Sequence, residues 1–225
     1  KQGTHRSLKM DKFAGNIPGK RSDEYVIVGA HFDHLGVDET LADDKINNGA
    51  DDNASGVSAV LQIARAFALS GEKPLRNVIF AFWDGEEKGL LGSKHFVQHC
   101  PFLKQIKGYL NFDMIGRNNK PEQPQHVVYF YTAAHPAFGE WLKRDITRYG
   151  LQLQPDYRPW DNPVGGSDNA SFARSGIPVI WYHTDGHPDY HQPSDHAALL
   201  NWEKSRGNNQ GILPQRMELA NESNY

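Results

Sequence analysis

Two adjacent glutamates, Glu86 and Glu87, stand directly after an apolar and aromatic run at residues 80–83. The run has the composition of a buried strand, and Asp84-Gly85 is a turn signal that ends it. Neighbouring residues on a turn point in different directions, so one carboxylate can bind a metal ion while the other faces the water on that ion. Taken alone, the pair is more typical of a solvent-exposed acidic turn before a helix.

Further acidic and histidine groups occur at or near the ends of other predicted strands, namely His31/Asp33/His34, Asp51/Asp52, Asp113 and His187/His191. Asp113 lies in an apolar run, where a buried carboxylate is costly unless it is paired or bound to a metal. Imidazole and carboxylate ligands without thiolates suit Zn²⁺, with Mn²⁺ or Co²⁺ as alternatives. The carboxylates are numerous enough for two ions that share a bridging ligand.

The elements that must position these groups alternate between strand and helix patterns. Apolar runs predict buried strands at residues 25–30, 78–83, 109–116, 127–131 and 177–183. Helical spacing predicts helices at residues 57–69 and 136–149, whereas residues 151–162 are expected to be extended and irregular. We therefore predict one α/β domain over residues 1–225, with a mostly parallel, mixed central β-sheet flanked by helices on both faces. The carboxyl ends of its strands would bring all the chemical groups to one crevice.

The composition excludes several functional classes. The chain of 225 residues carries 24 Lys+Arg and 27 Asp+Glu, a formal net charge of −3, so nothing indicates a nucleic-acid partner. No apolar run approaches the length of a membrane span, and the single Cys100 excludes an intrachain disulfide. The oligomeric state is not indicated by the sequence.

Five motifs, in order along the chain, resemble those of the M28 family of co-catalytic zinc aminopeptidases, in particular its bacterial, leucine-aminopeptidase-like members. They are His31-Phe32-Asp33-His34, Gly49-Ala50-Asp51-Asp52-Asn53-Ala54-Ser55-Gly56, Asp84-Gly85-Glu86-Glu87, Asn111-Phe112-Asp113-Met114-Ile115-Gly116 and Tyr190-His191-Gln192-Pro193-Ser194-Asp195. The resemblance extends over about residues 25–195. Any one motif would be weak, but five at similar spacing are specific. The resemblance implies the zinc-peptidase (phosphorylase/hydrolase-like) fold.

The resemblance also implies which residues hold metal. His31 and Asp113 would bind one Zn²⁺, Glu87 and His191 would bind the other, and Asp52 would bridge the two ions. The peptide bond after the bridging aspartate is expected to be cis. Two zinc ions per chain are therefore expected.

Other matched residues would support the reaction. Glu86 would be the general base that takes a proton from the metal-bridging water and passes it to the leaving amine. Tyr190 would help to stabilise the oxyanion. Asp33 would orient His31 through its second ring nitrogen, and Asp168 would support the site from outside the ligand set.

The four remaining histidines near the site are expected to be structural or supporting residues rather than ligands: His34, His183, His187 and His196. Among the aromatic residues near the motifs, Trp83 is expected in the core. Trp160, Trp181 and Tyr182 are equally candidates for the core and for a pocket that takes an apolar first side chain.

The implied function is hydrolysis of the N-terminal residue from peptides with a free N-terminal amine. A glutaminyl-cyclase-like acyl transferase would share the fold and most ligands but use one zinc. A metallo-carboxypeptidase would need a cationic clamp, for which Arg117 and Arg158 are candidates. A non-catalytic binding module fits least, because the ligands and the base are all present.

The resemblance and the missing initial methionine lead us to expect a periplasmic or secreted enzyme.

Overall fold

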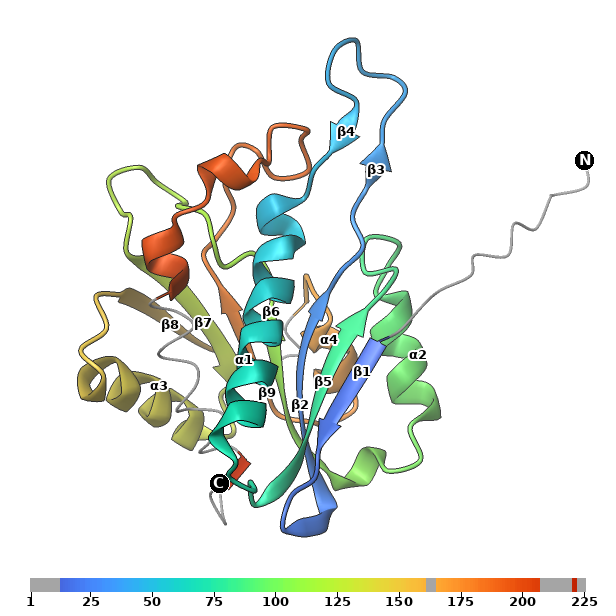
Figure 1. Cartoon of the computed structure of the whole chain (residues 1–225), viewed down its shortest axis with the longest axis vertical. Helices are drawn as coiled ribbons and strands as arrows, with labels where there is room; N and C mark the ends of the chain where they lie inside the picture. The colour runs from blue at the N-terminus through green and yellow to red at the C-terminus, as the bar shows by residue number, and fades with distance from the viewer. Residues whose placement is uncertain (1–12, 161–164, 207–219, 222–225) are drawn as a thin grey trace, which may run out of the picture.

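A seven-stranded mixed sheet forms the centre of the computed structural model, which describes residues 13–160, 165–206 and 220–221 (Figure 1). The strand order is β1-β5-β2-β6-β9-β7-β8. The strands are β1 (Phe13–Ile17), β2 (Arg21–His31), β5 (Arg76–Trp83), β6 (Ile106–Phe112), β7 (His126–Thr132), β8 (Gln154–Trp160) and β9 (Val179–His183).

Most strand pairings in this sheet are parallel. The pairs β2–β5, β2–β6, β6–β9 and β7–β8 are parallel, whereas β1–β5 and β7–β9 are antiparallel. The antiparallel β1 lies at one edge, next to β5. Strands β5, β2 and β6 are therefore parallel neighbours, and their carboxyl ends lie side by side at one edge of the sheet.

Helices cover both faces of the sheet. On one face, α1 (Gly56–Ser70) and α3 (Pro136–Arg148) pack against the core that includes Val28 of β2 and Tyr129 of β7. On the other face, α2 (Leu91–His99) and α4 (Asn169–Ala173) pack against a smaller core around Trp83. The predicted fold class, a mostly parallel α/β sheet with helices on both faces, is confirmed. The domain boundaries, residues 1–225, stay a prediction.

One segment expected to be irregular is a regular strand. Pro155 and Pro159 lie within β8, which pairs in parallel with β7 along its whole length. The Gln154 N–H donates to Gln125 O (2.8 Å), and successive N–H positions alternate in direction. The two proline nitrogens therefore point away from β7. Because β8 is an edge strand, their missing donors break no hydrogen bond of the sheet.

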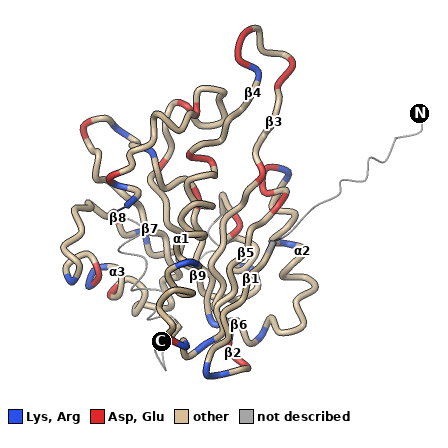
Figure 2. Tube along the Cα trace, viewed as in Figure 1, with Lys and Arg blue, Asp and Glu red and all other residues tan. Residues whose placement is uncertain are grey.

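A two-stranded ribbon, β3 (Gly36–Val37) and β4 (Ile46–Asn47), projects beyond the end of the sheet where β2 and β5 finish (Figure 1). Its connection carries Asp38, Glu39, Asp43 and Asp44, and Figure 2 shows further acidic residues below it. None of the helices in the described part of the chain is both long and apolar enough to cross a membrane.

A buried chain of hydrogen bonds links the core to the end of β6. The Trp83 indole N–H donates to the Tyr109 hydroxyl (2.9 Å), which donates to Asn111 Oδ1 (2.7 Å). The Asn111 amide in turn donates to Ser167 Oγ (2.8 Å). Gly29 of β2 lies against this chain, since a Cβ there would be 2.8 Å from both Trp83 Nε1 and Tyr109 Oη.

The substitution Gly29→Ala should lower the free energy of unfolding by about 1–3 kcal/mol, because the added methyl group overpacks a buried, hydrogen-bonded site. The matched control is Gly15→Ala in β1, where a Cβ would meet nothing within 4 Å. The control should change stability by less than about 1 kcal/mol. Urea unfolding of the wild type and both variants measures these free energies of unfolding. Equal stability of the two variants would contradict the overpacking argument.

Candidate metal centre

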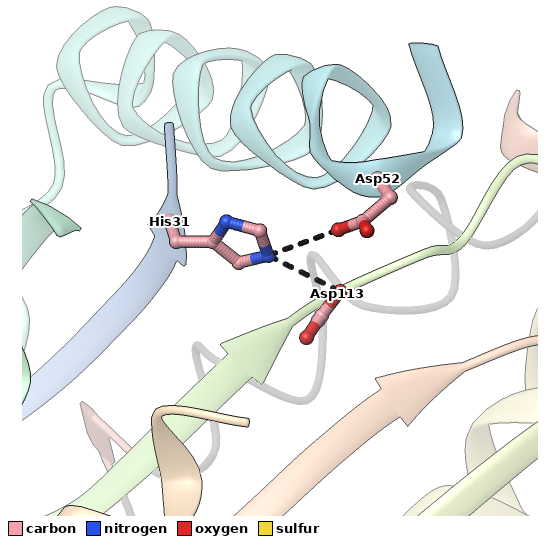
Figure 3. A group of neighbouring side chains, drawn as sticks. All are labelled: His31, Asp52 and Asp113. Carbon is pink, nitrogen blue, oxygen red and sulfur yellow. Dashed lines mark ion pairs between the residues drawn. The ribbon is translucent and has the colours of Figure 1, made fainter. Parts of the chain in front are cut away.

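Three of the predicted ligands meet where parallel strands end. His31 is the last residue of β2, and Asp113 follows β6 directly. Asp52 comes from η1 (Ala50–Ser55), the turn before α1. The His31 Nε2 atom lies 3.2 Å from Asp52 Oδ1 and 3.5 Å from Asp113 Oδ1 (Figure 3). All three residues are buried, and together they can hold one metal ion.

The other predicted ligands gather on the second oxygen of Asp52. The His191 Nε2 atom lies 3.1 Å from Asp52 Oδ2 and 3.2 Å from Glu87 Oε2. Asp52 therefore presents Oδ1 to one histidine and Oδ2 to another. The structure thus brings all five predicted ligands together around Asp52.

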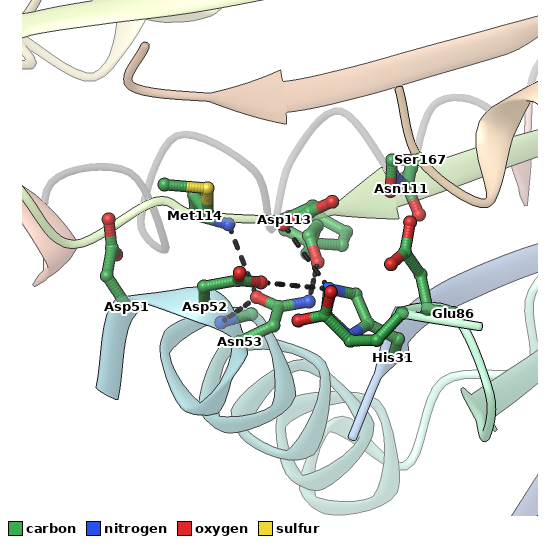
Figure 4. A network of polar contacts seen from close by, with 12 residues as sticks. His31, Asp51, Asp52, Asn53, Glu86, Asn111, Asp113, Met114 and Ser167 are labelled. Carbon is green, nitrogen blue, oxygen red and sulfur yellow. Dashed lines mark hydrogen bonds and ion pairs between the residues drawn. The ribbon is translucent and has the colours of Figure 1, made fainter. Parts of the chain in front are cut away.

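Asn53 holds two ligand-bearing turns together. Its side-chain N–H donates to Phe112 O (2.9 Å), and its Oδ1 accepts from the N–H groups of Gly56 (3.1 Å) and Met114 (3.3 Å). These contacts tie the Asp52 turn to the end of β6, as Figure 4 shows. The Asp52-Asn53 peptide bond is cis, as expected.

Asp195, a buried residue that sequence reasoning did not single out, holds the backbone of the Asp52 turn. Asp195 Oδ2 accepts hydrogen bonds from the main-chain N–H groups of Asp51 (2.9 Å) and Asp52 (3.2 Å). Asp51 accepts from the N–H of Gly116 (2.6 Å), and its other oxygen lies 3.3 Å from His187 Nε2. Asp195 is the last residue of the fifth matched motif, so the motif itself was the signal that could have identified it.

Asp33 contacts its neighbours differently from the prediction. The His31 Nδ1 atom is 3.2 Å from the main-chain carbonyl of Asp33 and 3.8 Å from the carboxylate, too far for a hydrogen bond. The carboxylate instead accepts from the N–H groups of Glu86 (3.0 Å) and Glu87 (3.2 Å). Asp33 thus orients His31 through its backbone and fixes the two glutamates through its side chain.

Glu86 lines a cavity of about 170 Å³ beside the ligands, together with Tyr190, Trp181 and His183. Burial raises the pKa of Glu86 to about 8, against the lowering effect of His31 and with help from the charges of Asp113 and Asp168. A carboxyl group with such a pKa can exchange a proton near neutral pH.

Burial raises the pKa of two further residues of the predicted site, Tyr190 and Asp168. The Tyr190 ring stacks on His191 (centroids 3.8 Å apart), and burial together with nearby carboxylates raises the pKa of its hydroxyl, so the group stays a neutral donor. Asp168 is fully buried, and burial raises its pKa to about 7. Its negative charge helps to raise the pKa of Glu86, and its supporting role stays a prediction.

The other histidines near the site have distinct contacts. His187 pairs with Asp51, and the His183 Nδ1 atom lies 2.7 Å from the main-chain carbonyl of Asp113. The exposed His196 is 4.0 Å from Asp44. His34, in contrast, lies 2.8 Å from Glu87 Oε1 and forms a possible ligand group with Asp52 and Glu87.

The aromatic candidates divide between core and cavity. Trp83 is buried in the core, as expected, and Tyr182 is buried as well. Trp181 lines the cavity. Trp160 is 40% exposed, packs near Phe130 and is not among the residues that line this cavity.

The chemistry of the site fits divalent metal. Burial raises the pKa of Asp52, and Asp113 Oδ1 is buried without a hydrogen-bond donor among the described residues. Burial lowers the pKa of His31, but the charges of Asp113 and Asp52 outweigh this and hold it well above its usual range. The cluster thus attracts positive charge strongly, and its nitrogen and oxygen donors are those that Zn²⁺ prefers.

Comparison with known proteins gives consistent matches. The sequence model of peptidase family M28 matches residues 13–214. Leupeptin-inactivating enzyme 1 of Streptomyces exfoliatus is 33% identical over 164 residues, which are 72% of this chain and 33% of that protein. The chain therefore spans about a third of the length of this relative.

Solved structures share the fold. The LapA aminopeptidase of Legionella pneumophila has a TM-score of 0.74 and 26% identity over 95% of this chain and 60% of its own. A glutaminyl cyclase from an Acidobacteriales bacterium has a TM-score of 0.74, with 19% identity over 96% of this chain and 75% of its own. At that identity, the second likeness concerns the fold alone.

The substitution Asp52→Asn should abolish stabilisation by zinc while leaving the metal-free protein folded at pH 7. Burial raises the pKa of Asp52 above its unfolded value, so the ionised carboxylate costs stability at pH values above the pKa of the unfolded carboxyl. The loss of its charge beside His31 acts in the opposite direction. Zinc at 100 times its Kd should stabilise the wild type by about 2.7 kcal/mol.

Thermal unfolding with and without zinc measures both effects. Asp43→Asn, at an exposed position in the β3–β4 connection, is the control and should respond to zinc as the wild type does. A zinc response in the Asp52→Asn variant equal to that of the control would exclude Asp52 as a ligand.

Proposed function

The chain belongs to peptidase family M28, and from this premise we propose that it is a di-zinc aminopeptidase that hydrolyses the first peptide bond of peptides with a free N-terminal amine. One observation carries the proposal. The two carboxylate oxygens of Asp52 face two different ligand groups, each with its own histidine. Such an arrangement suits two ions that share one carboxylate.

The residues that would hold the ions follow from these positions. His31 and Asp113 would hold one Zn²⁺, Glu87 and His191 would hold the other, and Asp52 would contact both. When bound, the pair of ions would supply a water molecule of lowered pKa and positive charge for the substrate carbonyl oxygen.

Glu86 would act as the general base and then as the general acid. Its main-chain N–H is held by Asp33. Its side chain borders the cavity beside His31, Asp52 and Asp113. In this place it can take a proton from water and return it to the leaving amine. The Tyr190 hydroxyl, a neutral donor on the same cavity, would donate to the oxygen of the substrate carbonyl as negative charge develops there.

The charges around the cavity favour a substrate amine over a substrate carboxylate. Three acidic residues, Asp52, Glu86 and Asp113, border it, and no lysine or arginine is among its lining residues in the described part of the chain. The two arginines considered as clamps are not among the described residues that line this cavity, and each forms an ion pair with an aspartate. Arg117 pairs with Asp189, and Arg158 makes two contacts with Asp185 (2.9 and 3.0 Å). Carboxypeptidase activity is therefore the weaker proposal.

A glutaminyl-cyclase-like transferase is the second candidate function, because the fold is shared with such an enzyme. The presence of both His31 and Asp113 beside Asp52 favours two ions and hydrolysis instead. We further propose, from the family resemblance, that the enzyme acts in the periplasm or outside the cell.

Hydrolysis of leucine anilide and of its N-acetylated form, each with and without a chelator, tests the function directly. We expect release from the free-amine substrate only, and loss of that release with chelator. Cleavage of the acetylated form would contradict an aminopeptidase. No release from either substrate, with zinc bound, would favour the cyclase, and N-terminal glutamine peptides would be assayed next.

The substitution Glu86→Gln should lower kcat by about 10²–10⁴, because an amide cannot accept the proton from water. Zinc content should stay at the wild-type level, since Glu86 belongs to neither ligand group. Steady-state kinetics and metal analysis measure these two quantities. Glu122→Gln, at an exposed position, is the matched control and should leave both unchanged. Wild-type activity in Glu86→Gln would rule out the proposed base.

A further inference from the structure

His34 contacts a proposed zinc ligand, yet the two-ion arrangement assigns it no role. Its Nδ1 atom lies 2.8 Å from Glu87 Oε1 and 3.7 Å from Asp52 Oδ2. Its side chain is 11% exposed, and Nε2 is buried without a hydrogen-bond partner among the described residues. The contact joins residues 53 positions apart in the sequence.

The ring of His34 is seated by its surroundings. A Cβ at Gly49 would lie 2.8 Å from the Cγ and Cδ2 atoms of the ring, so only glycine leaves space for it. Gly49 also has a φ of 61°, which glycine adopts without strain. On another side, the ring meets His191 at 66° with centroids 5.8 Å apart. The orientation of His34 is therefore set by packing.

Distances separate two possible roles for this imidazole. Zinc lies about 2.0–2.2 Å from its nitrogen and oxygen ligands, so two ligand atoms in a tetrahedral shell are roughly 3.3–3.5 Å apart. A charge-assisted N–H···O⁻ hydrogen bond is about 2.7–2.9 Å long. The 2.8 Å between His34 Nδ1 and Glu87 Oε1 matches the hydrogen bond. The 3.2 Å between His191 Nε2 and Glu87 Oε2 is near the ligand separation.

We propose that His34 is a positioning residue that donates its Nδ1–H to Glu87 Oε1 and so directs Glu87 Oε2 toward the ion shared with His191. The inference rests on the proposed function, because it takes Glu87 as a zinc ligand. Asp33, the residue before His34, accepts hydrogen bonds from the main-chain N–H groups of Glu86 and Glu87. Asp33 thus fixes the main chain of the glutamate pair, and His34 fixes the side chain of Glu87.

The test compares His34→Ala with His34→Asn in the full chain. Competition with a zinc chelator gives the two zinc dissociation constants, and thermal unfolding of the metal-free protein reports the fold. We expect His34→Ala to weaken one of the two constants by about 10–100-fold and to leave the other unchanged. His34→Asn should restore most of the loss, because its amide N–H can donate to Glu87 but is a poor zinc ligand.

Each result is decisive. Wild-type affinities in His34→Ala, with the fold intact, would overturn the proposal. A loss in His34→Asn as large as in His34→Ala would mean that His34 is itself a ligand, and would also overturn it. His99→Ala, an exposed histidine of α2, is the control and should bind both ions normally. If the wild type bound fewer than two ions, the proposed function would fail, whatever the variants did.

Discussion

The burial of several carboxylates at one end of the sheet is the constraint that shapes the rest of this structure. The side chains of Asp51, Asp52, Asp113 and Asp168 are all nearly inaccessible to solvent. An ionised carboxylate in such a place is costly unless hydrogen bonds or opposite charges compensate it. These groups avoid that cost in different ways. Asp51 accepts a main-chain N–H from Gly116, Asp52 and Asp113 lie beside His31, and burial raises the pKa of Asp168 to about 7, which favours its neutral form.

The central sheet positions some of the proposed metal ligands, and segments outside the sheet carry the others. The parallel neighbours β5, β2 and β6 deliver Glu86 and Glu87, His31 and Asp113 to one edge. Asp52 comes from η1, which Asn53 ties to the end of β6, and His191 comes from a loop after β9. Asp195 joins those two segments, because it lies four residues after His191 and accepts the N–H groups of Asp51 and Asp52. Sheet pairing, the side chain of Asn53 and the buried carboxylate of Asp195 therefore locate the five proposed ligands.

One of the five proposed ligands is more exposed to solvent than the other four. The side chains of His31, Asp52, Asp113 and Glu87 are 1%, 4%, 7% and 5% exposed, whereas that of His191 is 33% exposed. His191 also has a φ of 57°, an uncommon conformation for a residue with a side chain, and such conformations concentrate at functional sites. Tyr190 stacks on its ring at the cavity. The proposed site thus has one enclosed side and one side open to substrate.

Much of this protein was determined by local sequence alone. Apolar runs with His31, Glu86 or Asp113 at or near their ends indicated strands that carry metal-binding or acid–base side chains at their carboxyl ends. The strand and helix patterns indicated the fold class. Local patterns failed at β8, because Pro155 and Pro159 are typical of irregular chain unless the strand lies at an edge. The sequence does not show which strand that is.

Only the tertiary structure decided how the supporting groups act. Asp33 holds the glutamates through its carboxylate, His34 contacts Glu87 from 53 positions away, and Asp195 reaches Asp51 from 144 positions away. A polar residue in a turn has the same local pattern whether it faces solvent or a buried partner. Its partner is set by sheet order and by the path of distant loops, so contacts of this kind follow from the packed fold and cannot be read from neighbouring residues.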